Sequence, residues 1–590
     1  MTKHAIPFSG KFFKELKESE HTYVVILAFI IGILAGLGAI LFKYMIEGVQ
    51  WLVFSGTGEL FYIIKDAPFY MKLLAPSLGG LLVGLIIYKF AREAKGHGVP
   101  EVMSAVALRG GIIRKRIVAI KAIASALSIG TGSSVGSEGP IVQIGSAIGS
   151  ALGQALNFSG ARMKSMVACG AAAGIAAIFN APIAGVMFSV EIILGNIAFS
   201  TFSPLVVSAV TATIISRAWW GDIPTFHVPK YELVSPLEIP AYLLLGLIAA
   251  AVAVTFSKTL YRTEDFFDDK VNMPPYFKTA LGGLCIGVIG IFSPHIFGVG
   301  YQVIDLSLLG EMPFYLLASL VVLKIIATSI SLGSGSSGGV FAPSLFIGAA
   351  TGGAFGTVAH SIFPSISATS GAYALVGMGA VVAGTTYAPI TAIMIIFEMT
   401  SDYQIILPLM LTCITSTIFA SYLSKESIYT MKLARQGINL QAGKEVNILK
   451  SILVKDAMAK GAQTIDESMT VRQFNDFLAN SKHSNFPVVN EKGELTGILS
   501  FQDFKGVMFE PGLEDLIVIK ELATEKVITI TSDENLDDAF KKIGSKNIEQ
   551  LPVISKKNPN KIVGMLSRRD IISAYNKGLF EHRLKEQKEE

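Results

Sequence analysis

The sequence predicts an all-α polytopic membrane domain followed by a smaller α+β domain. Of the 590 residues, 51% are hydrophobic and 16% are charged, and the mean hydropathy is +0.54. A soluble chain of this length needs more polar surface to cover its core. Apolar runs of about 15–25 residues follow one another from Thr22 to Gly437, a length that suits helices crossing a hydrocarbon layer ~30 Å thick. The pattern after Gly437 is typical of soluble protein.

The ends of the first apolar runs indicate how the chain enters the membrane. Residues 1–21 contain four lysines but neither an apolar core nor a cleavage site of a signal peptide, so we expect a cytosolic N-terminal segment. The basic cluster Arg114–Arg116 lies between two apolar runs, where the positive-inside rule predicts a cytosolic loop.

Composition and short motifs argue against several classes of protein. The net charge of +4 is small and dispersed, so no nucleic acid partner is expected. Cys169, Cys285 and Cys413 lie inside apolar runs without mutual spacing, which indicates packing residues and neither disulfides nor metal ligands. Neither Gly-Lys pair is followed by Ser or Thr, as a nucleotide-binding P-loop requires. Transport should therefore depend on ion gradients, with no required cofactor.

The membrane region contains an internal repeat. The segment from Lys121 to Gly145 matches the segment from Lys324 to Gly348 at a constant offset of 203 residues, with lysine, serine, glycine and proline in register. A second block, from Gly170 to Glu191, matches the block from Gly377 to Glu398 at an offset of 207. Repeated halves with interrupted segments are a signature of transporters, whose ion site lies where the broken helices meet.

Three glycine-rich breaks interrupt the two halves, which span about 22–220 and 238–437. The breaks are GHGVPE at 96–101, GSEGP at 136–140 and GSGSSGGVFAP at 333–343, and later Ala-Pro turns add further interruptions. Broken backbone inside a membrane is tolerated only where it lines a cavity or is buried in protein. The spacing leaves open whether the two halves are parallel or inverted.

These breaks have the chemistry of an anion site. A proline just inside the following helix marks a helix N-terminus, where free N–H groups and the helix dipole attract negative charge. The three breaks contain no Lys or Arg, which favours conduction because a buried cation would hold the anion too tightly. The pattern GxGxxG at 333–338 lacks the soluble βαβ context of a dinucleotide site, so we discard that reading.

The breaks, together with FNAP at 179–182 and Tyr429, resemble the CLC family of chloride channels and proton-coupled chloride transporters. The resemblance covers Thr22 to Gly437. It implies two inverted halves, a homodimer, and a separate pathway for chloride or a similar anion in each subunit. The cysteine usage and short loops favour a prokaryotic inner membrane, with the N-terminus and the C-terminal domain in the cytosol.

The resemblance also assigns roles to residues. Glu138 matches the gating glutamate, whose carboxylate competes with the anion and whose protonation would free the site. The alternative role for this residue is simple stabilisation of a helix dipole. Positions that match the family's anion ligands are the backbone N–H groups of Ser137, Gly139, Val340 and Phe341 and the hydroxyl of Tyr429.

Two departures from the family concern the anion site. His97 stands where familiar members have Ser, and it could donate a hydrogen bond to the anion and titrate near neutral pH. It could equally be a histidine that its neighbours orient and satisfy. Ser137 stands where Arg or Lys commonly precedes the gating glutamate.

A third departure concerns protons. The inner proton-transfer glutamate of the exchangers falls on Ile192, and their second buried glutamate falls on Met103. These residues favour a passive channel, with a proton-coupled antiporter as the alternative if protons travel through Glu191 or water. Glu191 and Glu398 repeat each other, so a shared structural role at a helix end is an equal explanation for Glu191.

The C-terminal region contains a second repeat. FPVV at 486–489 precedes GILSFQD, and LPVI at 551–554 precedes GMLSRRD. This resembles a tandem pair of CBS domains over 452–575, joined by a linker at 438–451 and followed by a charged tail at 576–590. The resemblance offers adenine nucleotide as a ligand and matches its contacts to Ser500, Asp503, Ser567 and Asp570. The alternative is that these Ser and Asp side chains cap helices.

Two other classes of protein remain as alternatives. A CBS-regulated divalent-cation transporter would need several carboxylates in the membrane, whereas this chain has glycine-rich breaks and few acids there. An enzyme is the more distant alternative, because no metal-ligand cluster or nucleophile–base set stands out. The sequence thus predicts an anion transporter whose partners are the bilayer, the anion and a second copy of the chain.

Overall fold

The computed structural model describes residues 20–588 apart from gaps at 57, 59, 159, 196–198, 227, 232, 437–448, 450–451, 480, 482–483, 505–513, 547 and 557. The chain forms two compact units, Met1–Gly437 and Ile438–Glu590, and each is considered by itself. Most of the predicted N-terminal segment and all but one residue of the predicted linker lie outside the described residues.

The first unit is helical. Nine of its described helices are long and apolar enough to cross a membrane, which confirms the predicted polytopic domain. Its helices are α2 (Glu20–Phe54), α3 (Leu60–Lys65), α4 (Phe69–Phe90), α5 (Val99–Leu108), α6 (Ile117–Gly130), α7 (Glu138–Ala155), α8 (Gly160–Phe179), α9 (Pro182–Phe188), α10 (Phe199–Trp220), α11 (Ile239–Asp265), α12 (Pro275–Phe292), α13 (Tyr301–Leu308), α14 (Phe314–Gly333), α15 (Phe341–Ile362), α16 (Ser370–Thr386), α17 (Pro389–Thr400), α18 (Ile406–Leu423) and α19 (Thr430–Arg435).

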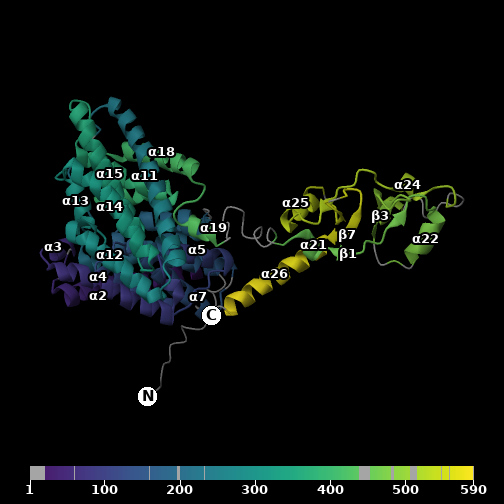
Figure 1. The fold of residues 1–590 in the computed structure, drawn as a ribbon, viewed down its shortest axis with the longest axis horizontal. Coiled ribbons are helices and arrows are strands. Elements are labelled where there is room, and N and C mark those ends of the chain that lie inside the picture. Colours follow the sequence, from purple (N-terminus) through teal and green to yellow (C-terminus); the bar gives the residue numbers. More distant parts are fainter. Residues whose placement is uncertain are drawn as a thin grey trace, which may run out of the picture. The chain divides into compact units, whose positions relative to one another are not determined.

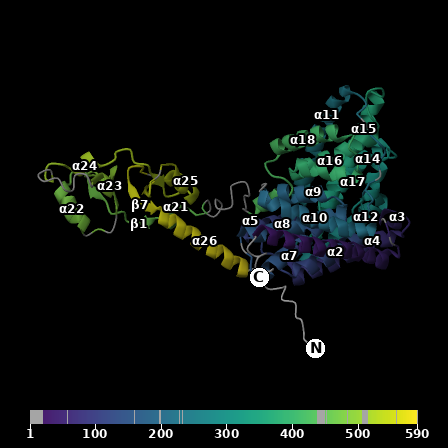
Figure 2. The ribbon, with the colours of Figure 1, turned by 180° about the vertical axis from the view of Figure 1, so that it is seen from behind.

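The sequence repeat corresponds to a structural one. Helices α6, α7, α8 and α9 of the first half match α14, α15, α16 and α17 of the second half. Within the first unit, most first-half helices, drawn purple to blue, gather at one end, and most second-half helices, drawn teal to green, gather at the other (Figures 1 and 2). The predicted anion site lies where these two sets of helices meet.

Glycine pairs hold matching helices together in each half. A Cβ atom on Gly145 of α7 would lie 2.1 Å from the carbonyl oxygen of Gly170 on α8. In the second half, a Cβ on Gly348 of α15 would lie 2.5 Å from the carbonyl oxygen of Gly377 on α16. Small residues let helix backbones touch, which is how helices associate in a membrane. Close packing of the helix backbones therefore explains why these glycines occur at matching positions in both halves.

Two buried lysines anchor matching loops. The ammonium of Lys121 donates to the carbonyl oxygens of Ala94 (2.9 Å) and Gly96 (2.8 Å), just before α5. The ammonium of Lys324 donates to the carbonyls of Ile296 (3.1 Å) and Gly298 (2.9 Å), just before α13. Both side chains are fully buried, so these bonds replace the lost hydration of each cation. Each lysine fixes the loop that leads into a short helix.

The second unit has the α+β composition that the sequence predicts, with two sheets in separate halves (Figure 1). One sheet has the order β2-β3-β4 and the other β1-β7-β6-β5, and each contains a parallel pair followed by an antiparallel pair. The strands are β1 (Ala459–Lys460), β2 (Ile465–Asp466), β3 (Asn485–Val489), β4 (Leu495–Ser500), β5 (Ile530–Thr531), β6 (Gln550–Ile554) and β7 (Ile562–Ser567).

The helices of the second unit complete two equivalent modules. They are α21 (Val454–Ala457), α22 (Val471–Ala479), α23 (Phe501–Phe504), α24 (Ile519–Leu522), α25 (Leu536–Lys546) and α26 (Arg568–Lys588). Helix α26 runs through the boundary placed at Tyr575, so the segment 576–588 continues that helix. Its one glycine, Gly578, does not end the helix, and the Lys, Arg and Glu residues of this segment are good helix formers.

Candidate functional site

The three glycine-rich breaks meet in the interior of the first unit. Gly136 and Gly339 exchange two backbone hydrogen bonds, of 2.8 and 2.6 Å. Gly96 donates to the carbonyl of Ser336 (3.1 Å) and accepts from the N–H of Gly338 (3.4 Å). Helices α5, α7 and α15 therefore begin beside one another, as the predicted anion site requires.

Only glycine fits at the closest approaches between these breaks. A Cβ on Gly139 would lie 2.0 Å from the carbonyl oxygen of His97, and a Cβ on Gly339 would lie 2.8 Å from the amide nitrogen of Gly139. Real Cβ atoms do not approach backbone atoms so closely, so any larger residue would push the breaks apart. The glycines allow two helix N-termini to face one another.

Free amides line these N-termini. Ser137 precedes the first residue of α7, and Val340 precedes the first residue of α15, so the amides of Gly139, Val340 and Phe341 lack acceptors inside their own helices. Among the described residues, no hydrogen bond uses these three N–H groups. The same amides are the ones that the family resemblance identifies as anion ligands.

The carboxylate of Glu138 lies among these groups. Its side chain is buried, and a Cβ on Gly136 or Gly339 would come within 2.0 or 2.8 Å of Oε2. The backbone N–H groups of Glu138 itself, Ala342 and Ser137 lie close enough to stabilise the ionised carboxylate. Oε1 accepts a hydrogen bond from the hydroxyl of Tyr301 (3.3 Å), while Oε2 has no partner among the described residues. The carboxylate contacts the breaks of both halves.

His97 lies on another side of the breaks, next to Tyr261 and Tyr429. The hydroxyl of Tyr261 donates to the carbonyl of Ile428 (2.6 Å), so its oxygen accepts a hydrogen bond from the Nε2–H group of His97 (3.2 Å). Nδ1 of His97 has no partner among the described residues, and the His97 ring lies 5.8 Å from the buried Tyr429 ring. Tyr261 thus orients His97, as one of the two predicted roles requires.

Sequence reasoning did not identify Tyr261 or Tyr301. Tyr261 belongs to an ordinary apolar helix, α11, and no motif surrounds it. Tyr301 follows Gly300, at the position that the structural repeat pairs with the start of α5. The turn GHGVP at 96–100 corresponds to GVGYQ at 298–302, and comparison of these two turns could have drawn attention to Tyr301.

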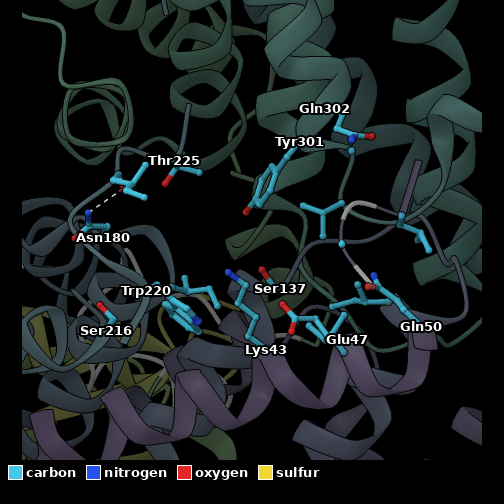
Figure 3. A pocket seen from close by; sticks show the side chains of 18 of the residues that line it. Lys43, Glu47, Gln50, Ser137, Asn180, Ser216, Trp220, Thr225, Tyr301 and Gln302 are labelled. Carbon is cyan, nitrogen blue, oxygen red and sulfur yellow. Dashed lines mark hydrogen bonds between the residues drawn. The ribbon is translucent and has the colours of Figure 1, made fainter. Parts of the chain in front are cut away.

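A cavity of about 480 Å³ lies in front of Ser137, and we call it the vestibule (Figure 3). Lys43 and Glu47 of α2 point into it, and Tyr301 points into it from α13. The ammonium of Lys43 lies 4.3 Å from the centre of the Trp220 ring. The vestibule therefore reaches the residue before Glu138 and carries both signs of charge.

Glu191 and Glu398 cap each other's neighbouring helices. Glu191, in the π-helical turn Ser189–Leu194 that follows α9, accepts from the N–H groups of Ile390 (3.3 Å) and Thr391 (2.8 Å) at the start of α17. Glu398 of α17 accepts from the N–H groups of Ile183 (2.9 Å) and Ala184 (2.7 Å) at the start of α9. This geometry matches the shared structural role that the repeat suggested.

The positions that the family resemblance matches to proton-transfer glutamates are apolar in this chain. Ile192 and Met103 are both buried, each with 6% of its surface exposed. Neither side chain can bind or release a proton. A role of Glu191 in proton transfer stays a prediction.

The paired Ser and Asp residues of the second unit bond to each other. The Ser500 hydroxyl lies 2.6 Å from Oδ2 of Asp503, and the Ser567 hydroxyl lies 2.5 Å from Oδ2 of Asp570. The same Asp oxygens accept from the backbone N–H groups of Ser500 (3.1 Å) and Ser567 (2.8 Å). Each Ser–Asp pair caps the helix that follows its strand, α23 or α26, as the alternative to nucleotide binding requires. Nucleotide binding by these residues stays a prediction.

Comparisons with known families and proteins agree with this architecture. The family model described as voltage gated chloride channel matches residues 79–421, and the CBS domain model matches 454–510 and 519–577. The chain is 38% identical over 413 residues to a putative chloride channel protein ClcB-like of Ralstonia nicotianae, covering 69% of this chain and 96% of that protein. It is 32% identical over 438 residues to the H(+)/Cl(-) exchange transporter ClcA of Salmonella arizonae, covering 72% and 92%.

Two solved structures of CLC-type proteins are also similar to this chain. A slow cyanobacterial Cl-/H+ antiporter superposes with a TM-score of 0.65 at 28% identity, covering 70% of this chain and 97% of that chain. A eukaryotic CLC transporter superposes with a TM-score of 0.62 over 93% of this chain and 97% of that chain. At 20% identity, this second likeness concerns the fold alone.

Proposed function

The chain belongs to the voltage-gated chloride channel (CLC) family with a C-terminal pair of CBS domains, and on that premise we propose that it conducts chloride passively through a pathway gated by Glu138. The observation that carries this proposal is the meeting of α7 and α15, with free amides at both N-termini and the Glu138 carboxylate between them. Backbone dipoles bind an anion without a full positive charge, so the anion can also leave.

Glu138 acts as the gate in this proposal. Its carboxylate occupies the place that a chloride ion would take beside the amides of both helices, so anion and carboxylate exclude each other. Protonation removes the charge of the carboxylate and its attraction to the amides. Anion flux should therefore rise as the medium becomes more acidic.

Five groups complete the anion site: the N–H groups of Ser137, Gly139, Val340 and Phe341 and the hydroxyl of Tyr429. His97 adds a sixth. Its Nε2 proton is held by Tyr261, so in the neutral ring Nδ1 is an acceptor. Nδ1 becomes a donor to the anion only when the ring is protonated.

Passive conduction is favoured by Ile192 and Met103, which offer no proton acceptor where exchangers have one. Proton-coupled exchange is the second candidate, because the relative from Salmonella arizonae is an H(+)/Cl(-) exchange transporter. A reversal potential measured in lipid bilayers under a proton gradient separates the two. Conduction predicts a potential that follows the chloride gradient alone, and a shift with the proton gradient would establish exchange.

The remaining assignments follow from the same family. The chain forms a homodimer in an inner membrane, with the CBS pair in the cytosol, where an adenine nucleotide contacts Ser500, Asp503, Ser567 and Asp570. The Ser hydroxyls and Asp carboxylates already bond to each other, so ribose hydroxyls would have to compete for the carboxylates. Calorimetric titration of the full chain with ATP, ADP and AMP tests this ligand, and absence of heat for all three would exclude it.

A further inference from the structure

Tyr301 connects the vestibule to the gating carboxylate. Its side chain lines the vestibule together with Ser137, and it points across the cavity toward Ser137 (Figure 3). Its hydroxyl donates to Oε1 of Glu138 over 3.3 Å. Tyr301 belongs to the second half of the repeat and Glu138 to the first, so this hydrogen bond joins the two halves at the gate.

We propose that Tyr301 is a positioning residue that latches the ionised carboxylate of Glu138 in the anion site. The proposal rests on the gating role of Glu138 proposed above. Among the described residues, Tyr301 supplies the one side-chain hydrogen bond to this carboxylate. A hydrogen bond to a charged acceptor is stronger than one between neutral groups, so its loss should be measurable.

The surroundings of Tyr301 hold its ring in place. It is the first residue of α13, and Gly300 before it adopts a positive φ of 87°. A Cβ on Gly300 would lie 2.7 Å from the Phe346 ring, so the turn is tightly packed. Lys324 anchors the preceding loop by donating hydrogen bonds to two of its carbonyls. The ring of the buried Phe226 packs edge-on against the Tyr301 ring, with centroids 5.6 Å apart.

A fixed ring matters because a latch needs its donor in one position. Ordering a mobile side chain costs entropy on each closure, whereas a ring already held by its neighbours loses little. The packing of Phe226 and the anchored loop thus make the Tyr301 hydroxyl a preorganised donor. The carboxylate alone has to move when the gate opens.

Other charged groups near the gate come from several elements. Lys324 of α14 and Tyr429, which precedes α19, both interact electrostatically with Glu138. Lys43 and Glu47 of α2 and Arg217 of α10 line the vestibule. The ammonium of Lys324 is bound to two carbonyls, and none of these groups donates a hydrogen bond to Glu138 among the described residues. Replacing the Tyr301 hydroxyl leaves all of them in place.

The proposed role of Tyr301 predicts in which direction the pH dependence of anion flux will shift. A hydrogen bond donated to the charged carboxylate favours the charged form, so without it the neutral, open form arises at a lower proton concentration. In Tyr301→Phe we expect the pH of half-maximal anion flux to move upward by about one unit, a tenfold change in proton concentration. Flux at neutral pH should rise with it.

The experiment measures anion efflux from proteoliposomes over a range of pH. The matched control is Tyr387→Phe, which removes a hydroxyl bonded to the carbonyls of Ala420 (3.0 Å) and Ser424 (2.8 Å), away from Glu138, and should leave the midpoint unchanged. A second variant, Phe226→Leu, keeps the Tyr301 hydroxyl but loosens its ring, and should shift the midpoint in the same direction by less. If thermal unfolding shows that Tyr301→Phe is poorly folded, the shift of the midpoint in Phe226→Leu tests the proposal instead. An unchanged midpoint in Phe226→Leu would then refute it.

Comparison with Glu138→Gln separates this inference from the proposed gate. If Glu138→Gln abolishes the pH dependence and Tyr301→Phe keeps the wild-type midpoint, the latch is refuted and the gate stands. If Glu138→Gln leaves the pH profile unchanged, the gate itself is wrong and the latch falls with it. In the double variant, Tyr301→Phe should add nothing to the profile of Glu138→Gln.

Discussion

Gly136 and Gly339 exchange two backbone hydrogen bonds, of 2.8 and 2.6 Å, and so join the break of the first half to the break of the second. This short pairing places the N-terminus of α7 beside that of α15. Each helix then directs its positive dipole end into the same region. The anion site is a property of the joined halves and of neither half alone.

Gly139→Ala should disrupt this region. The new Cβ would lie 2.0 Å from the carbonyl oxygen of His97, so the first turn of α7 must move. Displacement of a positioned donor by even ~1 Å can cost orders of magnitude, and we expect anion flux to fall by more than about tenfold. Flux in proteoliposomes tests this, with Gly48→Ala as control because a Cβ there meets nothing within 4 Å. Equal flux in both variants would contradict the proposed packing.

Glu138→Gln should remove most of the pH dependence of anion flux. The amide has the shape of the carboxylate but no charge to hold it among the helix N-termini, so flux at neutral pH should approach the acid-stimulated level of the wild type. Glu311→Gln makes the same chemical change at an exposed site and should retain the wild-type profile. A Glu138→Gln profile that still follows pH would place the gate elsewhere.

Lys43 and Glu47 should act in opposite directions on anion capture from the vestibule. Both line this cavity, one turn apart on α2 (Figure 3). Lys43→Gln should lower flux at low salt by about two- to tenfold and Glu47→Gln should raise it, with both effects fading at high salt through screening. Lys230→Gln, an exposed lysine outside the vestibule, serves as control. Equal changes in all three variants would contradict a local effect.

Glu191 and Glu398 should contribute to stability in the same way. Each accepts from two N–H groups at the start of a helix in the opposite half. Glu191→Gln and Glu398→Gln should each reduce the free energy of unfolding by about 1 kcal/mol, because a neutral cap interacts less with the helix dipole. Thermal unfolding in detergent measures this. If Glu191→Gln abolished proton-coupled flux while Glu398→Gln did not, the predicted proton route through Glu191 would be supported.

The sequence predicted the glycine-rich breaks, the repeat and the CBS pair because residue types and their spacing reveal these features without a structure. Glycine and proline mark a helix start wherever they stand, and an offset of 203 residues can be read without a structure. The matched lysines Lys121 and Lys324 were visible in the same way, although their common task of anchoring a loop was not.

The partners of the site could not be predicted because they come from distant helices. Tyr301 is 163 residues from Glu138, and Tyr261 is 164 residues from His97. Tyr261 lies in no motif, Tyr301 is marked only by a turn that repeats the one before α5, and only tertiary packing brings each hydroxyl to its partner. Lys43 likewise reaches the vestibule from the first described helix, α2. Such contacts depend on how helices cross, which periodicity does not reveal.

Anomalous diffraction from crystals of Glu138→Gln grown in bromide tests the central claim most directly. The account predicts a bromide peak at the former position of the carboxylate, within hydrogen-bonding reach of backbone N–H groups at the N-termini of α7 and α15. In wild-type crystals at neutral pH that peak should be absent or weaker, because the carboxylate occupies the site. Bromide bound only in the vestibule, or only beside lysine or arginine side chains, would contradict anion binding by the backbone of interrupted helices.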